Sequence, residues 1–135
     1  MECPQDAIDE VARLNCKGLD FELVEVGSQW FALTRVEAPS PPWDRDAYDI
    51  LVVLPGAYAD ASLDAFYLGL PYSFHNNVHP RISGDQIQHG GRTWQLVSWH
   101  YPDNRPWQRN LDDIESHVAH CRGFFLNRGA ENAIN

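Results

Sequence analysis

Residues 79–126 read HPRISGDQIQHGGRTWQLVSWHYPDNRPWQRNLDDIESHVAHCRGFFL and hold most of the landmarks of this 135-residue chain. A His-Pro pair predicts a turn, and two tryptophan-rich segments follow it. A further tryptophan, Trp107, precedes a run with helical periodicity. Cys121 is the only cysteine of the stretch and lies near its end. Between the His-Pro pair and Trp107 the chain therefore has no cysteine, and Ser98 lies there in the segment VSWH.

The end of this stretch has the periodicity of an amphipathic helix. Asn110 is a preferred N-cap residue, and Asp112 and Asp113 would then lie in the first turn, where the helix dipole favours negative charge. Arg128 and Gly129 are typical of a helix end. A helix that begins near Asn110 would bury one apolar stripe, formed by Leu111, Ile114, Val118, Cys121 and Phe125.

The first half of the chain carries clear helix and strand signals. Residues 5–15 predict a short helix with an acidic first half. Residues 21–26 and 30–36 predict an antiparallel hairpin, because a Gly-Ser turn signal separates the two apolar runs. The run 48–54, YDILVVL, is apolar almost throughout, which is typical of a central strand buried on both faces.

The signals that follow are weaker but complete the order of elements. Aromatic residues between positions 66 and 74 predict a short strand followed by an irregular packed segment. Gly90-Gly91 predicts a turn, and residues 92–99 alternate like a strand. The order of helix, antiparallel strands, irregular segment and helix indicates one α+β domain over residues 1–135, with its helices on one face of the sheet.

The composition limits the classes of partner. The formal net charge of -9 and the pI of about 4.9 argue against general nucleic-acid binding, which depends on lysine and arginine. An acidic surface fits a basic partner, or it serves only to keep the chain in solution. The acidic N-terminus does not resemble a signal peptide, and no apolar run is long enough to span a bilayer. We therefore expect a cytoplasmic protein without a membrane partner.

Cysteines and histidines do not form a disulfide or metal motif. Three widely spaced cysteines make no disulfide framework, and Cys121 on the apolar stripe predicts a buried thiol that behaves as a small hydrophobe. His75 and His79 are four apart, but they precede a proline where no helical pattern exists. His117 and His120 are three apart and lack a third ligand. We expect structural or solvated histidines and no metal site.

Taken together, these landmarks resemble a ubiquitin-conjugating (UBC) domain, in which a His-Pro turn precedes the catalytic residue and a tryptophan follows it just before a helix. Trp107 matches that closing tryptophan, and residues 54–58, LPGAY, resemble the proline-containing strand end of the fold. The chain looks most like the prokaryotic family E type, over about residues 20–128. The resemblance implies a UBC-like fold, an antiparallel β-meander with an N-terminal helix and a C-terminal helix packed on the sheet. Two departures are Arg81, where the family usually has asparagine, and a longer interval before Trp107.

The resemblance also implies a function and its partners. Such proteins accept the C-terminus of a ubiquitin-like modifier from an activating enzyme and pass it to an amine. They tend to be encoded beside the modifier, the activating enzyme and a deconjugating peptidase. This chain would need no cofactor of its own, because the activating enzyme consumes the ATP.

The resemblance places Ser98 close to where the family has its catalytic cysteine, so the covalent intermediate would be an oxyester. A serine hydroxyl needs a base to take its proton, and His100 lies two residues away, on the same face if the segment stays extended. His100 could instead position the amine or polarise the carbonyl. Asn77, or its neighbour Asn76, could donate a hydrogen bond to the oxyanion, although both precede the His-Pro turn rather than follow it.

Three other interpretations remain open from the sequence. Ser98 could be an ordinary strand residue, and His100 could pack among the aromatic side chains. In that case the same fold would be a non-catalytic scaffold that binds a modifier or a conjugating partner. The chain could also be a small α+β binding protein unrelated to ubiquitin, in which the tryptophans are only core.

Overall fold

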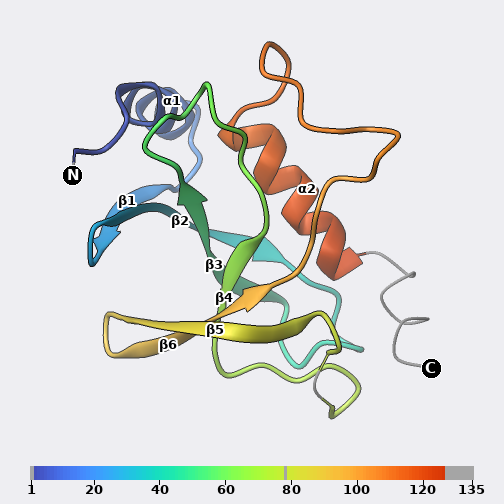
Figure 1. Cartoon of the computed structure of the whole chain (residues 1–135). Coiled ribbons are helices and arrows are strands. Elements are labelled where there is room, and N and C mark those ends of the chain that lie inside the picture. The colour runs from blue at the N-terminus through green and yellow to red at the C-terminus, as the bar shows by residue number, and fades with distance from the viewer. Residues whose placement is uncertain (1, 78, 127–135) are drawn as a thin grey trace.

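The structure is a computed structural model and describes residues 2–77 and 79–126 (Figure 1). Two helices and six strands follow one another along the chain in the predicted order, with one additional strand. They are α1 (Gln5–Cys16), β1 (Glu22–Val26), β2 (Gln29–Glu37), β3 (Ala47–Leu54), β4 (Phe66–Gly69), β5 (Ile82–His89), β6 (Arg92–Val97) and α2 (Ile114–Leu126).

All six strands form one antiparallel sheet in the order β1-β2-β3-β4-β6-β5. The predicted hairpin is confirmed, with Leu23 opposite Ala32 in the register of β1 and β2. The strand predicted at 48–54 is confirmed as β3, which lies inside the sheet and buries Ile50, Leu51 and Val52 completely. The α+β class and the UBC-like arrangement of helices and antiparallel sheet are confirmed. The β5–β6 hairpin interrupts a simple meander because β6, not β5, pairs with β4.

β5 is the strand that the sequence analysis missed. Its residues ISGDQIQH contain only two large apolar side chains, because it is an edge strand whose Asp85, Gln86 and Gln88 face solvent. The turn predicted at Gly90-Gly91 is confirmed, and both glycines have positive φ (62° and 72°), a backbone conformation that favours residues without a Cβ. β6 ends at Val97, two residues before the predicted end.

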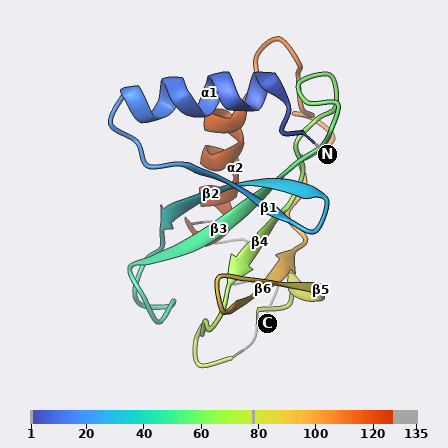
Figure 2. The same cartoon turned by 90° about the vertical axis from the view of Figure 1, so that its left-hand side faces the viewer.

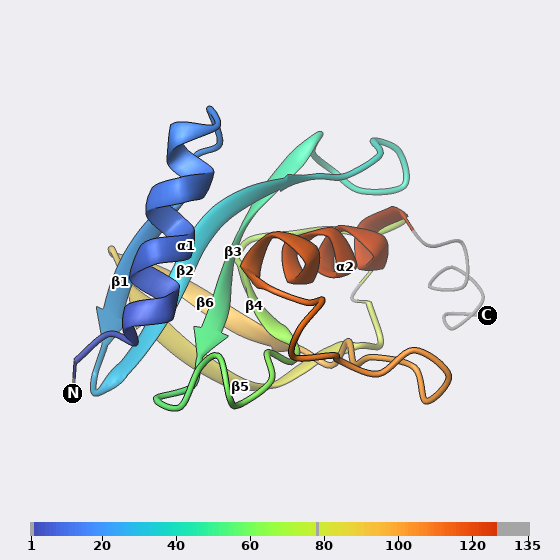
Figure 3. The same ribbon diagram turned by 90° about the horizontal axis from the view of Figure 1, so that it is seen from above.

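Buried side chains occupy both faces of the sheet. Both helices cover one face, as Figures 2 and 3 show, and the core between them and the strands contains Leu14, Ile50, Phe66 and Phe124. A second, smaller cluster lies on the opposite face, where the sheet curls until the edge strands β1 and β5 come close. That cluster contains Val24, Phe31, Leu51 and Trp94.

The predicted start of α2 was wrong. The helix begins at Ile114, because Asp113 is its N-cap: its side chain accepts from the Ser116 N–H, and the Ser116 hydroxyl accepts from the Asp113 N–H, both at 2.9 Å. Asn110 therefore lies outside the helix, and Leu111 is 71% exposed rather than part of the apolar stripe. The other four stripe residues are buried. The helix end predicted at Arg128 and Gly129 lies outside the described residues.

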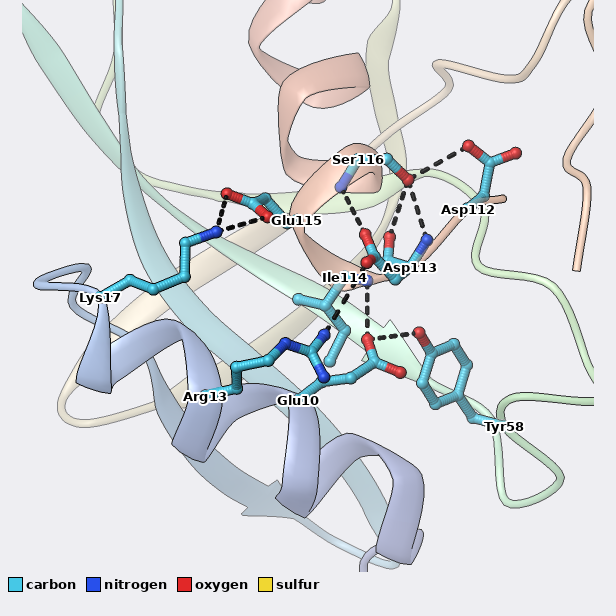
Figure 4. A network of polar contacts seen from close by, with 9 residues as sticks. All are labelled: Glu10, Arg13, Lys17, Tyr58, Asp112, Asp113, Ile114, Glu115 and Ser116. Atoms are coloured by element: carbon cyan, nitrogen blue, oxygen red, sulfur yellow. Dashed lines mark hydrogen bonds and ion pairs between the residues drawn. The ribbon is translucent and has the colours of Figure 1, made fainter. Parts of the chain in front are cut away.

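One carboxylate from α1 ties the start of α2 to the rest of the molecule (Figure 4). An oxygen of Glu10 accepts from the Ile114 N–H at 2.9 Å and from the Tyr58 hydroxyl at 2.8 Å. Glu10 thereby satisfies a backbone donor at the first turn of α2, which has no partner inside the helix. Because Tyr58 belongs to the segment between β3 and β4, this network fixes that segment against both helices.

Candidate functional site

Two loops lie next to each other at one edge of the molecule and border an open cleft. One, the 55–65 loop, joins β3 to β4, and the other, the 98–113 loop, joins β6 to α2 (Figure 3). Arg109 of the second loop donates to Asp60 of the first at 2.8 Å. The cleft has a volume of about 360 Å³ and is lined by Ser62, Leu63, Asp64, His100, Tyr101, Pro106 and Trp107.

Ser98 is the first residue after β6 and is partly exposed. Its backbone N–H donates to the carbonyl of Arg81 at 2.9 Å, so the candidate nucleophile is held beside the turn that follows His79. Within the described residues, no hydrogen bond engages the Ser98 hydroxyl.

The extended geometry expected for residues 98–100 is not present. The N–H of Trp99 donates to the carbonyl of Val97 at 3.0 Å, which closes a tight turn at Ser98. The physical reason is the tryptophan, whose indole N–H donates to the carbonyl of His120 at 2.9 Å and draws the chain towards α2. Spacing alone therefore does not place Ser98 and His100 on one face.

His100 is exposed and pairs with a residue that the sequence analysis did not single out. Its Nδ1 lies 3.0 Å from both carboxylate oxygens of Asp64, which belongs to the 55–65 loop. Among the described residues, His100 makes no hydrogen bond with Ser98. A histidine that does stack on aromatic rings is His120, whose ring centroid lies 4.0 Å from that of Tyr101 and 5.9 Å from that of Trp99.

Asn77 lies in a turn on the other side of the His-Pro pair. Its backbone exchanges hydrogen bonds with Phe74, and its side-chain amide donates to the carbonyl of His75 at 3.2 Å. The side chain is exposed, and in the part of the chain that the structure describes it bonds to neither Ser98 nor His100. One hydrogen of its NH₂ group remains available, since an amide nitrogen carries two.

A buried histidine of α2 forms hydrogen bonds with both loops. His117 of α2 has no exposed surface, and its Nε2 lies 3.0 Å from the carbonyl of Ala65, next to Asp64. Its Nδ1 lies 2.7 Å from the hydroxyl of Tyr101, next to His100. Because a carbonyl only accepts, Nε2 carries the proton and Nδ1 accepts from the tyrosine. Burial lowers the pKa of His117 to about 4, so the ring stays neutral and keeps both bonds at neutral pH.

Asp64 and His117 are the site residues that sequence reasoning missed. Asp64 lies in a segment with weak signals, 36 residues from His100, and no motif joins the two. His117 was considered only with His120, as a weak metal pair. Among the described residues, no three histidine, cysteine or acidic side chains are grouped as a metal site would need.

The cysteines do not offer a thiol near Ser98. Cys121 is completely buried, as its place on the apolar stripe predicts, and burial raises the pKa of its thiol well above the usual range. Such a thiol is neither accessible nor ionised at neutral pH. Cys16 is exposed, but it lies at the end of α1, outside the segment between the His-Pro turn and α2.

A comparison with known protein families identifies the family to which the chain belongs. Residues 7–125 match the family model of prokaryotic E2 family E, which confirms the resemblance drawn from the His-Pro turn and Trp107. The match assigns a role like that of a conjugating enzyme, in which a ubiquitin-like modifier and an activating enzyme are the general partners. Neither the curated proteins nor the solved structures gave a match. Within residues 2–77 and 79–126, no helix is both long and apolar enough to cross a bilayer.

Proposed function

Because the chain belongs to prokaryotic E2 family E, we propose that it carries the C-terminus of a ubiquitin-like modifier on Ser98 as an oxyester and passes it to an amine. The activating enzyme supplies the modifier, and the chain needs no cofactor. A deconjugating peptidase of the same pathway would reverse the modification.

The observation that carries the proposal is the position of Ser98 in a segment, from the His-Pro turn to the end of α2, whose one cysteine is buried. The serine lies between the His-Pro turn and Trp107, is partly exposed, and is held by its backbone bond to Arg81. The only cysteine between His79 and Leu126 is Cys121, which is buried. A family member that works through a covalent intermediate would therefore use the hydroxyl.

The transfer has two steps. In the first, Oγ of Ser98 attacks the glycyl carbonyl of the modifier, a C–O bond forms, and the bond to the activating enzyme breaks. The hydroxyl proton passes to a base and from there to the leaving group. In the second step the acceptor amine attacks the same carbon, the C–N bond forms, and Oγ leaves with the proton that the amine gives up.

Two further residues are proposed to assist. His100 acts as the base, or positions the amine, through its Nε2, because Nδ1 is bonded to Asp64. Asn77, or a backbone amide, donates to the oxyanion. Contacts of this kind are often long in free enzymes and tighten when the substrate binds. Neither residue contacts Ser98 in the free protein, so both roles depend on closure around the modifier.

The decisive experiment mixes the chain with its modifier, its activating enzyme and ATP, and measures a covalent adduct by intact mass. The adduct should resist thiol reductant and break with hydroxylamine or mild base. Ser98→Ala should abolish it while the far-UV circular dichroism stays unchanged, and Ser98→Cys should make it sensitive to reductant. An adduct that survives Ser98→Ala and disappears in Cys121→Ala or Cys16→Ala would refute the proposal.

A non-catalytic scaffold is the second candidate, and one observation favours it: no base contacts the Ser98 hydroxyl among the described residues. A scaffold would bind the modifier reversibly and form no ester. With an activating enzyme shown to be charged with modifier, complete absence of an adduct together with measurable binding would support this function instead.

A further inference from the structure

We infer that Asp64 is a positioning residue that holds His100 in the tautomer with the proton on Nδ1, so that Nε2 is free to take the proton of the Ser98 hydroxyl. This inference rests on the proposed function and adds a third member, from a distant loop, to Ser98 and His100.

The first argument is the chemistry of the contact. A carboxylate only accepts hydrogen bonds, so a neutral His100 that bonds to Asp64 must carry its proton on Nδ1. The lone pair is then on Nε2, which makes this nitrogen the basic one. Catalytic triads use the same logic, in which an acidic residue fixes the tautomer and orientation of the histidine and stabilises the imidazolium that forms.

The second argument is that the contact is built into the fold. Leu63, the neighbour of Asp64 on one side, is 1% exposed, and the carbonyl of Ala65 on the other side accepts from buried His117. Tyr101, the neighbour of His100, donates to the other nitrogen of the same His117 ring. One buried imidazole therefore holds the two chain segments that carry the pair.

The backbone at Ala65 supports this interpretation. Its φ of 49° lies in the left-handed region, which an alanine adopts only when the surrounding structure compensates the cost. Here the bond from His117 to its carbonyl and the burial of its side chain hold it there. The left-handed conformation of Ala65 is therefore part of the packed structure that sets the course of the chain next to Asp64.

Asp64 is the acidic side chain that contacts His100 in the described structure. Both side chains line the cleft between the two loops and remain more than half exposed, so an incoming modifier can reach them. Two arginines of the 98–113 loop are engaged with other carboxylates: Arg105 forms a two-pronged pair with Asp112, and Arg109 pairs with Asp60. Because solvent reaches the pair, water can replace the carboxylate in part, and we expect a smaller effect than in a buried triad.

The test has a spectroscopic part that needs no partner protein. Side-chain ¹⁵N shifts of His100, assigned with His100→Gln, report its tautomer at pH 8, where an ordinary imidazole is neutral. We expect mainly the Nδ1–H form in the unmodified chain and a shift towards Nε2–H in Asp64→Ala. Asp60→Ala is the matched control, since it removes a carboxylate from the same loop that does not touch His100. An unchanged tautomer in Asp64→Ala would overturn the inference.

The second part is a kinetic cycle of adduct formation with the modifier and the charged activating enzyme. Asp64→Ala should slow the reaction about tenfold and His100→Ala about a hundredfold, whereas Asp85→Ala, an exposed carboxylate on the edge strand β5, should leave the rate unchanged. If Asp64 acts through His100, adding Asp64→Ala to His100→Ala causes no further loss. A further tenfold loss in the double variant would mean that Asp64 acts directly on the substrate, and the inference would fail.

The two proposals can fail separately. If Ser98→Ala abolishes the adduct while Asp64→Ala reacts at the normal rate, the oxyester function stands and the role of Asp64 is refuted. If Ser98→Ala still forms an adduct, the oxyester function is refuted, and the role assigned to Asp64 is refuted with it, whatever the tautomer of His100.

Discussion

Lowering the pH from 7 to 5 should reduce the free energy of unfolding by about 4 kcal/mol, because two buried histidines are neutral in the folded chain. Burial lowers the pKa of both His79 and His117 to about 4. An unfolded chain binds a proton on each near pH 6.5. Since the folded pKa is the lower one, the stabilisation is complete above pH 6.5 and is lost as the pH falls towards 4.

The structure explains why neither ring accepts a proton readily. His79 has no exposed surface, and its Nδ1 accepts from the N–H of Arg81 at 3.1 Å. The proton of the neutral ring is therefore on Nε2, which has no hydrogen-bond partner among the described residues. Protonating Nδ1 would break the bond to Arg81. In His117, protonating Nδ1 would likewise break the bond that Tyr101 donates.

The magnitude follows from the two pKa values. At pH 5 an unfolded histidine is almost fully protonated and the folded one almost fully neutral, which amounts to about 2 kcal/mol for each residue relative to pH 7. Carboxylates contribute little in this window. The pKa of Asp112 is lowered to about 2, so its stabilisation is lost only below the ordinary value near 4. A loss of about 4 kcal/mol is a large part of the stability of a domain this size.

Urea unfolding followed by tryptophan fluorescence at pH 7, 6 and 5 measures the effect. Each of His79→Phe and His117→Gln should remove about 2 kcal/mol of the pH dependence, although both lower the stability at pH 7. If the free energy of unfolding changes by less than about 1 kcal/mol between pH 7 and 5, the argument from buried neutral histidines is wrong.

Two further predictions concern the supports of the site. Asp112→Asn should lower the free energy of unfolding by about 2 kcal/mol, because the 3% exposed carboxylate loses charge-assisted bonds from Arg105 and from the Gln108 N–H. A thermal melt measures the loss, and Asp60→Asn, which affects the exposed pair with Arg109, is the control that should change the melting temperature little. Glu10→Gln should lower the free energy of unfolding by about 1 kcal/mol, because it weakens the hydrogen bond from the Ile114 N–H. Urea unfolding measures this loss, and Asp9→Asn on the same helix is the control.

The sequence predicted the elements with strong periodicity. The run 48–54 could be identified as a central strand because nearly every residue is apolar, and burial on both faces requires that. β5 could not be identified in the same way, since an edge strand needs few apolar residues. The start of α2 was misplaced because Asn110 and Asp113 are both good N-cap residues, and the choice depends on Ser116 and on Glu10 from a distant helix.

For the candidate site, too, some features follow from the sequence and others depend on the tertiary structure. By itself, the sequence determined the family resemblance, the lack of a cysteine between the His-Pro turn and Trp107, and the choice of Ser98, because these depend on residue identity and order. Only the tertiary structure decided that the chain turns at Ser98, that His100 faces Asp64, and that His117 holds both loops. The contacts of His100 and His117 join residues 16 to 52 positions apart, and no local pattern encodes them. They arise because the curled sheet and α2 bring the two loops to one edge of the molecule.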